Sequence, residues 1–220
     1  MLKELVVIAT HGGADLLKES LPKFGDRPVA VVETGCATPE VFELTRLFKN
    51  VVYLSTPYKG YDTGAYLWAY WMVNAESYLF LQDSVSPREA DYFEQFAAKM
   101  PGKLGAVGWS SFDLTVWDSG QQCEAVQFMY GASDRWPKKG IFGPIFYTTR
   151  DSLKALDDSS LLPAYPVHKL GQQAMERAWP ILFHRAGMNV NFLVDENLPN
   201  GDRMARGQYP ALTKVFRQRA

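Results

Sequence analysis

The sequence predicts an α/β fold built on a mostly parallel sheet, and three observations carry this prediction. Short runs of apolar, often β-branched residues recur along the first half of the chain, as in strands buried on both faces. Segments with helical spacing of apolar residues separate these runs. Most of the runs end on hydroxyl, carboxyl or glycine residues. A β-α-β order of this kind calls for right-handed crossovers and a mostly parallel sheet.

The first half of the chain supplies four of these strands and the helices around them. The expected strands are 5–10, 28–33, 51–55 and 77–81, and the expected helices are 14–21, 39–49, the aromatic segment after residue 60, and 88–100. Pro22 closes the first helix, and Pro39 occupies the first position of the second, where its missing N–H costs nothing. This half covers residues 1–102.

The stretch 59–86 organises the rest of the chain. It combines a glycine-containing turn at 60–64, an aromatic helix and a buried strand that ends on Asp83. Asp62 or Thr63 is expected to cap the helix by accepting a hydrogen bond from its first turn. A carboxylate at the carboxyl end of a central strand lies where open α/β sheets bind ligands. The alternative is that Asp83 only caps the next turn.

The second half, residues 103–200, changes to short strands close together in sequence, which indicates antiparallel additions. The expected strands are 105–112, 114–117, 125–130, the apolar segment 141–149 with its Gly-Pro turn, and 188–194. The expected helices are 151–156 and 167–187, and Pro180 is expected to kink or split the latter. A basic tail, 201–220, follows. No linker divides the chain, so we expect a single domain.

Composition excludes several classes of protein. The net charge of −1 creates no overall attraction to nucleic acid or to an anionic membrane. The two cysteines, Cys36 and Cys123, form no disulfide framework or zinc cluster, which favours a reducing cytoplasm. The longest apolar run, 65–73, is too short to span a bilayer, so we expect no transmembrane segment, and the first residues do not resemble a signal peptide.

Four motifs resemble those of the GT-A glycosyltransferases, and the resemblance extends over roughly residues 3–195. They are V-V-E-T-G-C at 31–36, K-G-Y-D-T-G-A-Y at 59–66, F-L-Q-D-S at 80–84 and M-E-R at 175–177. In that family the first motif faces the nucleotide base and the second contacts the nucleoside and diphosphate. The third stands in the place of the D-x-D motif, and the fourth supplies the catalytic base. The resemblance implies a GT-A-like fold.

The resemblance also implies roles for individual residues. Asp83 would bind a divalent cation, Mn²⁺ or Mg²⁺, and take part in catalysis, and Glu176 would be the catalytic base. Trp109 and Ser110 would line the acceptor side. The donor would be a nucleotide-sugar, with a UDP-sugar favoured, and the transferred group a hexose or pentose. The residues expected at the donor are Thr10, His11, Glu33, Gly60, Tyr61, Asp62, Gly64 and Gln82.

The sequence departs from the family at three places. The D-x-D position keeps only Asp83, because Gln82 and Ser84 flank it. Arg177 follows Glu176 where a second acid is common, and His184 precedes the late strand instead of completing a metal site on it. A centre without metal, which uses an arginine or lysine, is therefore an open alternative.

Other residues have simpler interpretations that remain open. Glu33 could be a helix-capping or solvated acid, and His11 a histidine of a surface turn. Glu176 could pair at the surface with Arg177 or Lys169. Trp109 could belong to the core rather than form a platform for a sugar ring.

Two further functions and two acceptors also remain open. A nucleotidyltransferase would need a glycine-rich basic loop after the first strand, where this chain has H-G-G-A-D-L-L-K with only Lys18. A non-catalytic binding scaffold derived from a transferase is the other alternative. The acceptor could be a glycan or a modified DNA base, since the tail holds five basic residues and no acidic ones from residue 203 onward. The tail could equally be an ordinary disordered terminus.

Overall fold

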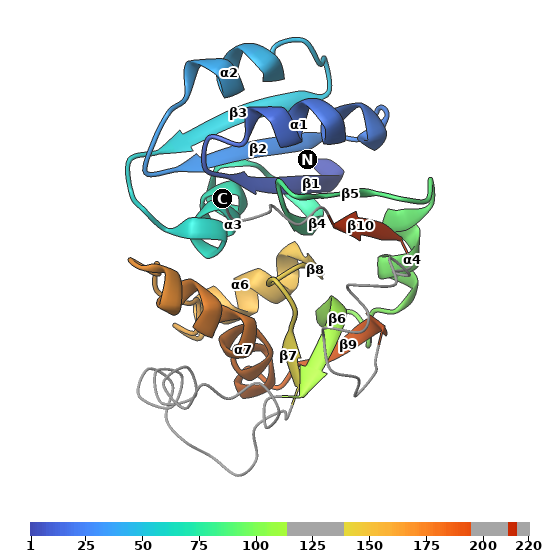
Figure 1. The fold of residues 1–220 in the computed structure, drawn as a ribbon. Coiled ribbons are helices and arrows are strands. Elements are labelled where there is room, and N and C mark those ends of the chain that lie inside the picture. The colour runs from blue at the N-terminus through green and yellow to red at the C-terminus, as the bar shows by residue number, and fades with distance from the viewer. Residues whose placement is uncertain (114–138, 195–210, 215–220) are drawn as a thin grey trace.

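A central eight-stranded sheet organises the molecule, whose computed structural model describes residues 1–113, 139–194 and 211–214 (Figure 1). The strand order is β3-β2-β1-β4-β8-β6-β7, and β9 also pairs with β6. These strands are β1 (Leu2–Thr10), β2 (Val29–Thr34), β3 (Val51–Thr56), β4 (Ala75–Gln82), β6 (Gly105–Asp113), β7 (Lys139–Ile141), β8 (Phe146–Thr149) and β9 (Asn189–Val194).

The first four strands are parallel, as the sequence predicts. β1 pairs with β2 on one side and with β4 on the other, and β2 pairs with β3. The register places Thr10 opposite Glu33, and Ala9 opposite Gln82. The polar ends of the three central strands therefore meet at one edge of the sheet.

The second half adds the antiparallel part. β8 runs antiparallel to both β4 and β6, β7 runs antiparallel to β6, and β9 is parallel to β6. The segment from β7 to β8 follows β6 through the predicted Gly-Pro turn, because Trp109 N–H donates to the Ile145 carbonyl and Phe142 N–H to that of Ser110 (both 2.9 Å). The mixed, mostly parallel α/β architecture that the sequence predicts is confirmed.

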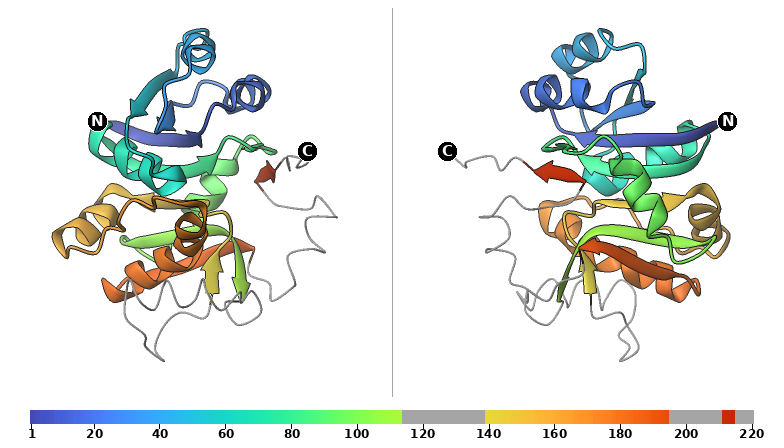
Figure 2. Two further views of the ribbon diagram at one scale, coloured as in Figure 1. Left: turned by 60° about the vertical axis from the view of Figure 1, so that its left-hand side comes forward. Right: turned by 90° about the vertical axis from the view of Figure 1, so that its right-hand side faces the viewer.

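Helices cover both faces of this sheet (Figure 2). One core contains α3, α6 and α7, and the other contains α1, α2 and α4. Alternate residues of β1 enter the two cores, Val7 the first and Ile8 the second, which explains its unbroken apolar run. The helices are α1 (Ala14–Ser20), the 3₁₀ helix η1 (Leu21–Phe24), α2 (Pro39–Thr45), α3 (Tyr61–Met72), α4 (Tyr92–Ala98), α6 (Arg150–Asp158) and α7 (Lys169–Arg185).

Several boundaries differ from the predicted ones. α2 and α4 are shorter than the expected helices 39–49 and 88–100. α7 continues through Pro180 as one helix, so the expected split there is wrong. None of the helices in the described ranges is both long and apolar enough to cross a membrane.

A second, two-stranded sheet is the feature that the sequence did not predict. β5 (Val85–Pro87) pairs antiparallel with β10 (Leu212–Lys214), so part of the expected basic tail returns to the body of the protein (Figure 1). The side chain of Leu212 is fully buried. The predicted strands 114–117 and 125–130 lie outside the described residues, as does Cys123.

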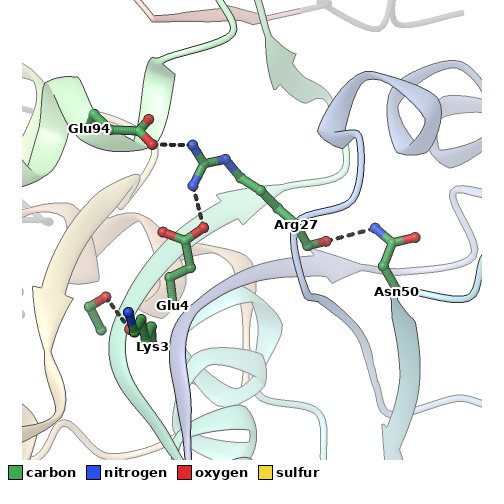
Figure 3. A network of polar contacts seen from close by, with 6 residues as sticks. Lys3, Glu4, Arg27, Asn50 and Glu94 are labelled. Carbon is green, nitrogen blue, oxygen red and sulfur yellow. Dashed lines mark hydrogen bonds and ion pairs between the residues drawn. The ribbon is translucent and has the colours of Figure 1, made fainter.

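Arg27 joins three elements at the end of the sheet where the parallel strands begin (Figure 3). Its guanidinium donates to Glu4 of β1 and to Glu94 of α4, and it lies 5.3 Å from the ring centroid of Tyr92. Asn50 Nδ2 donates to the Arg27 carbonyl at 2.7 Å. This network lies at the amino ends of the parallel strands, opposite to the carboxyl edge where their polar ends meet.

Candidate active site

Asp83 lies at the carboxyl edge of the sheet, directly after β4. Its N–H donates to the Ala9 carbonyl at 3.0 Å, which extends the pairing of β4 with β1 by one residue. Its Oδ2 accepts from Thr10 Oγ1 at 2.9 Å, and Thr10 Oγ1 in turn accepts from the Gly13 N–H at 3.1 Å. Asp83 therefore belongs to the sheet edge, half-buried beside Thr10. The next helix has Asp91 at its N-cap, and a cap of the turn after β4 by Asp83 stays a prediction.

Glu33, at the end of β2, forms what we call the Glu33 corner with Gly12, Thr38 and Tyr53. The Glu33 carboxylate accepts from the Gly12 N–H (3.2 Å), the Thr38 N–H (2.8 Å), Thr38 Oγ1 (2.7 Å) and the Tyr53 hydroxyl (2.6 Å). Burial alone would raise the pKa of Glu33, but these hydrogen bonds lower it overall. The side chain is 0% exposed. The structure thus makes Glu33 an internal anchor of two loops rather than a ligand of a nucleotide base.

His11 and Tyr61 lie together at the rim of the same edge. His11 is exposed, and its Nδ1 is 3.3 Å from both the carbonyl and the hydroxyl oxygen of Thr34. The rings of His11 and Tyr61 meet edge to face, with centroids 5.4 Å apart. Tyr61 has a φ of 48°, a left-handed conformation that costs a non-glycine residue about 1–3 kcal/mol. The structure brings these two predicted donor-binding residues together.

Gly60 and Gly64 begin α3, and both lie beneath the ring of Tyr165. A Cβ at Gly60 would lie 2.6 Å from Tyr165 Cδ1, and one at Gly64 would lie 2.8 Å from it. Glycine is therefore required here by the packing of an aromatic ring. No local pattern connects Tyr165 with this turn, because the two lie about a hundred residues apart.

Asp62 and Thr63 do not cap α3, which corrects the expected role of these two residues. The N-cap is Gly60, and the Thr63 N–H donates to Gln172 Oε1 at 3.3 Å. Asp62 is nearly buried, and its Oδ2 accepts from Gln82 Nε2 (2.7 Å) and Gln172 Nε2 (3.2 Å). Burial raises the pKa of Asp62. Protein groups thus already occupy this helix terminus, where a phosphate was expected.

Glu176 lies on α7, one turn after Gln172, and its side chain is half-buried. Burial raises its pKa to about 7, although the charges of Lys214 and Arg177 and a hydrogen bond from the Gly143 backbone oppose the shift, while Asp62 adds to it. A solvated surface acid would keep an ordinary pKa. Glu176 is therefore not a fully solvated acid, and the charge of Arg177 acts on it. An ion pair with Arg177 or Lys169 stays a prediction.

Lys214 of β10 completes the group around Glu176. Its Nζ donates to Gln82 Oε1 at 2.6 Å and lies 5.0 Å from the ring centroid of Phe142. Burial lowers the pKa of Lys214, and the carboxyl groups of Glu176, Asp62 and Asp83 oppose that shift. We call Asp62, Gln82, Gln172, Glu176 and Lys214 the inner cluster.

The inner cluster contains two residues that sequence reasoning missed. Gln172 stands four residues before Glu176 and so on the same face of a helix, which was a usable signal. Lys214 was noticed only as one of the basic residues of the tail. Nothing in the sequence pairs it with Gln82, 132 residues earlier.

The predicted acceptor residues are buried. Trp109 is 0% exposed and belongs to the core beside Phe112 and Ile145, and Ser110 is 2% exposed. The platform for a sugar ring is thus a wrong prediction for Trp109, and the alternative of a core tryptophan is correct. An indole with no accessible face cannot stack on a ligand.

The residues that the structure describes do not by themselves make a metal centre. Within these ranges no three histidine, cysteine or acidic side chains gather so that they could hold an ion. Asp83 is a single carboxylate that accepts from Thr10, and Asp62 Oδ2 already accepts two amide hydrogen bonds. One carboxylate holds Mg²⁺ only together with phosphate oxygens and water.

No family model matches the sequence, and no curated protein matches it. Solved structures do resemble the fold. The mannosyltransferase PcManGT from Pyrobaculum calidifontis, in complex with GDP-Man and Mn²⁺, matches 94% of this chain with a TM-score of 0.57 and 14% identity. S. aureus TarS 1–349 matches 89% with a TM-score of 0.54 and 14% identity, and it has also been solved with UDP-GlcNAc.

A third similar structure is a CMP:2-keto-3-deoxy-manno-octonic acid synthetase complexed with CTP. It matches 89% of this chain and 90% of its own, with a TM-score of 0.52 and 16% identity. The present chain spans only about three fifths of the mannosyltransferase (61%) and of TarS 1–349 (59%). The fold is a GT-A-like nucleotide-sugar transferase fold. At such low identity the likeness concerns the fold alone.

Proposed function

We propose that the protein is a glycosyltransferase that moves a hexose or pentose from a nucleotide-diphosphate donor to an acceptor hydroxyl. The observation that carries this proposal is the position of Glu176 in a GT-A-like fold. It is a half-buried carboxyl group on α7, one turn after Gln172, which contacts Asp62, and burial raises its pKa to about 7. A general base works best when its pKa lies near the operating pH.

Glu176 would act on the acceptor. Its carboxylate removes the hydroxyl proton while the acceptor oxygen bonds to the anomeric carbon of the sugar. The bond between that carbon and the donor phosphate breaks at the same time, and the nucleoside diphosphate leaves with the electron pair. The product is inverted at the anomeric carbon, and the proton remains on Glu176.

The donor would lie along the rim of the sheet edge. His11, Tyr61 and Gln82 are the predicted donor residues that remain at least partly accessible, and the half-buried Asp83 lies beside the buried Thr10. Asp62, Gln82, Gly60 and Gly64 would act indirectly, because they shape the start of α3. A divalent cation at Asp83 stays a prediction, and so does the preference for a UDP-sugar.

The acceptor, a glycan or a modified DNA base, also stays a prediction, as does a cytoplasmic location. The structure describes the surroundings of one basic residue of the tail. Lys214 is half-buried in the inner cluster and does not present its charge on an open face to a DNA backbone.

A nucleotidyltransferase is the second candidate, because the synthetase complexed with CTP matches this chain over 90% of its own length. The loop after β1 speaks against it. α1 follows this loop directly, and the first lysine after β1, Lys18, lies inside that helix. The third candidate, a non-catalytic scaffold, would bind a nucleotide or glycan and show no turnover.

A ligand screen tests these three functions. The protein would be melted with UDP, GDP, CMP, ADP and CTP and with the matching nucleotide-sugars, each in Mn²⁺, Mg²⁺ or EDTA. A ligand at a hundred times its Kd adds about 2.7 kcal/mol to the free energy of unfolding, a shift that is easily seen. Stabilisation by one nucleoside diphosphate, with release of that diphosphate from its sugar conjugate, supports the transferase. Stabilisation by CTP with release of pyrophosphate identifies a nucleotidyltransferase. Binding without turnover identifies a non-catalytic scaffold.

The variant Asp83→Ala adds a test of the role of Asp83 to this screen. We expect it to abolish sugar transfer and to leave the melting temperature within a few degrees of the wild type, because Asp83 is only half-buried. Normal transfer by this variant would remove Asp83 from the centre. A stabilisation by the nucleoside diphosphate that needs Mn²⁺ in the wild type and is lost in Asp83→Ala would identify Asp83 as a metal ligand.

A further inference from the structure

We propose that Lys214 binds the diphosphate of the nucleotide-sugar donor and supplies the positive charge on which its departure depends. This inference rests on the proposed transferase function. It assigns a specific role to one residue of the basic tail. It also explains how a centre with a single carboxylate after β4 can receive an anionic leaving group.

The backbone delivers Lys214 to this place. β10 pairs with β5 in the register that sets Lys214 opposite Val85, two residues after Asp83. The Arg88 N–H donates to the Ala211 carbonyl at 2.9 Å, just beyond this pairing. The buried side chain of Leu212 anchors the strand in the core. The position of the lysine therefore follows from a built strand pair.

The side chain of Lys214 is aimed inward. Its Nζ donates to Gln82 Oε1 at 2.6 Å and lies 5.0 Å from the centroid of the Phe142 ring. A Cβ at Gly143 would lie 3.2 Å from this Nζ and 3.3 Å from Gln82 Oε1. Gly143 also has a φ of +64°, a backbone conformation that residues with a side chain rarely adopt. The turn between β7 and β8 thus leaves the room that the ammonium group occupies.

The charges of the site favour a cation at this point. Asp62, Asp83 and Glu176 all interact electrostatically with Lys214, and Lys169 is a second positive charge that acts on it. A donor diphosphate would add further negative charge beside these three carboxyl groups. An ammonium ion is a strong point charge for phosphate oxygens, and it gains strength where water is partly excluded.

In the reaction, Lys214 would act on the bond that breaks. Negative charge develops on the phosphate oxygen as it separates from the anomeric carbon. A cation fixed at that oxygen before the reaction stabilises this charge more than it stabilises the bound donor. The lysine keeps its protons throughout.

The test compares diphosphate binding by four proteins: the wild type, Lys214→Met, Lys214→Arg and Lys23→Met. Lys23 is the matched control because its Nζ donates to Ser86 Oγ of the same strand β5 (3.3 Å), but its side chain is exposed. Calorimetry in EDTA, and separately in Mn²⁺, would measure Kd for UDP, GDP, CDP and ADP and for the corresponding nucleosides.

We expect the wild type and Lys23→Met to bind one diphosphate at least 10-fold more tightly than its nucleoside. Lys214→Met should lose about 10- to 100-fold of that affinity and leave the affinity for the nucleoside unchanged, while Lys214→Arg should recover most of the loss. A purely structural lysine would weaken both ligands alike or neither.

Three results would overturn the inference. If Lys214→Met keeps the full preference for the diphosphate, Lys214 does not bind phosphate. If the preference exists only in Mn²⁺ and persists in Lys214→Met, the metal performs this role. If the wild type binds no diphosphate, the proposed function fails first. Should Lys214→Met not fold, Lys214→Gln, which keeps a donor for Gln82 without the charge, takes its place.

Discussion

The Glu33 corner and the inner cluster hold similar acids in opposite states. Glu33 is completely buried, yet its pKa is lowered. Burial raises the pKa of Glu176 to about 7. The difference lies in the hydrogen-bond donors: Glu33 accepts from Thr38, Tyr53 and Gly12, whereas the Glu176 carboxylate receives a backbone hydrogen bond from Gly143. Burial acts to raise the pKa of both acids, and only in Glu33 do the hydrogen-bond donors outweigh it.

The largest expected effect is on turnover. Glu176→Gln should lower kcat by about 10²–10⁴-fold, because a positioned general base contributes that much, and it should leave the donor Kd unchanged. Steady-state kinetics and calorimetry of the same preparation would measure both quantities. Unchanged turnover would mean that another group takes the proton, or that the reaction retains configuration and needs no such base.

The pH dependence of kcat should reflect the same carboxyl group. Glu176 accepts a proton only when it is ionised, so kcat should rise with pH through about 7 and then level off. Asp62, Lys214 and Arg177 surround this group and set the midpoint. Lys214→Gln removes a charge that lowers the pKa, so it should move the midpoint upward. A flat profile between pH 5 and 9 would contradict the role of Glu176.

For the stability of the fold, we expect Glu33 to matter more than Glu176, the reverse of the order for turnover. Glu33→Gln should lower the free energy of unfolding at pH 7.5 by about 2–3 kcal/mol, because hydrogen bonds to a charged acceptor are lost. The pKa of Glu33 is lowered in the fold, so its contribution is present above the unfolded pKa of about 4.5 and disappears as the pH falls through the folded value. Urea titrations at several pH values would measure this.

Glu176→Gln is the control for that measurement. Its raised pKa means that the folded protein holds a proton more tightly than the unfolded chain, so ionisation costs stability between about pH 4.5 and 7. At pH 7.5 the variant should be as stable as the wild type or more stable. A loss equal to that of Glu33→Gln would remove the distinction between the two acids.

The smallest expected effect concerns one donor of the Glu33 corner. Tyr53→Phe removes the hydroxyl that donates to Glu33 at 2.6 Å and should cost about 1 kcal/mol. Tyr58→Phe is the matched control, since that side chain is 65% exposed. Thermal melts of the two variants would compare them. Equal stabilities would mean that the other donors satisfy Glu33 without Tyr53.

The parts of the fold that local pattern determines were predictable from the sequence. The runs at β1, β2 and β4 are apolar on both faces because helices cover both faces of the sheet. Asp83 could be placed because parallel strands share one carboxyl edge. Glu33 and Trp109 were ambiguous for the same reason: their residue types suit a binding site and a packed interior equally well.

The inner cluster was not predictable, because it depends on tertiary pairing. Gln172 reaches Asp62 over 110 residues, and Lys214 reaches Gln82 over 132. Neither contact has a local pattern, and the strand pair β5–β10 is only three residues long on each side. Short pairs of this kind lack the periodicity from which strands are recognised.

The pairing of β10 with β5 also bears on how the protein is made. Thr10 and Asp83 of the sheet edge and Glu176 of α7 all precede residue 180, but Lys214 joins them from much further along the chain. Chains are synthesised from the amino end at about 5–20 residues per second. Lys214 must therefore be synthesised before this site has all its charged residues. A nascent chain can form its main sheet while the site still lacks this lysine.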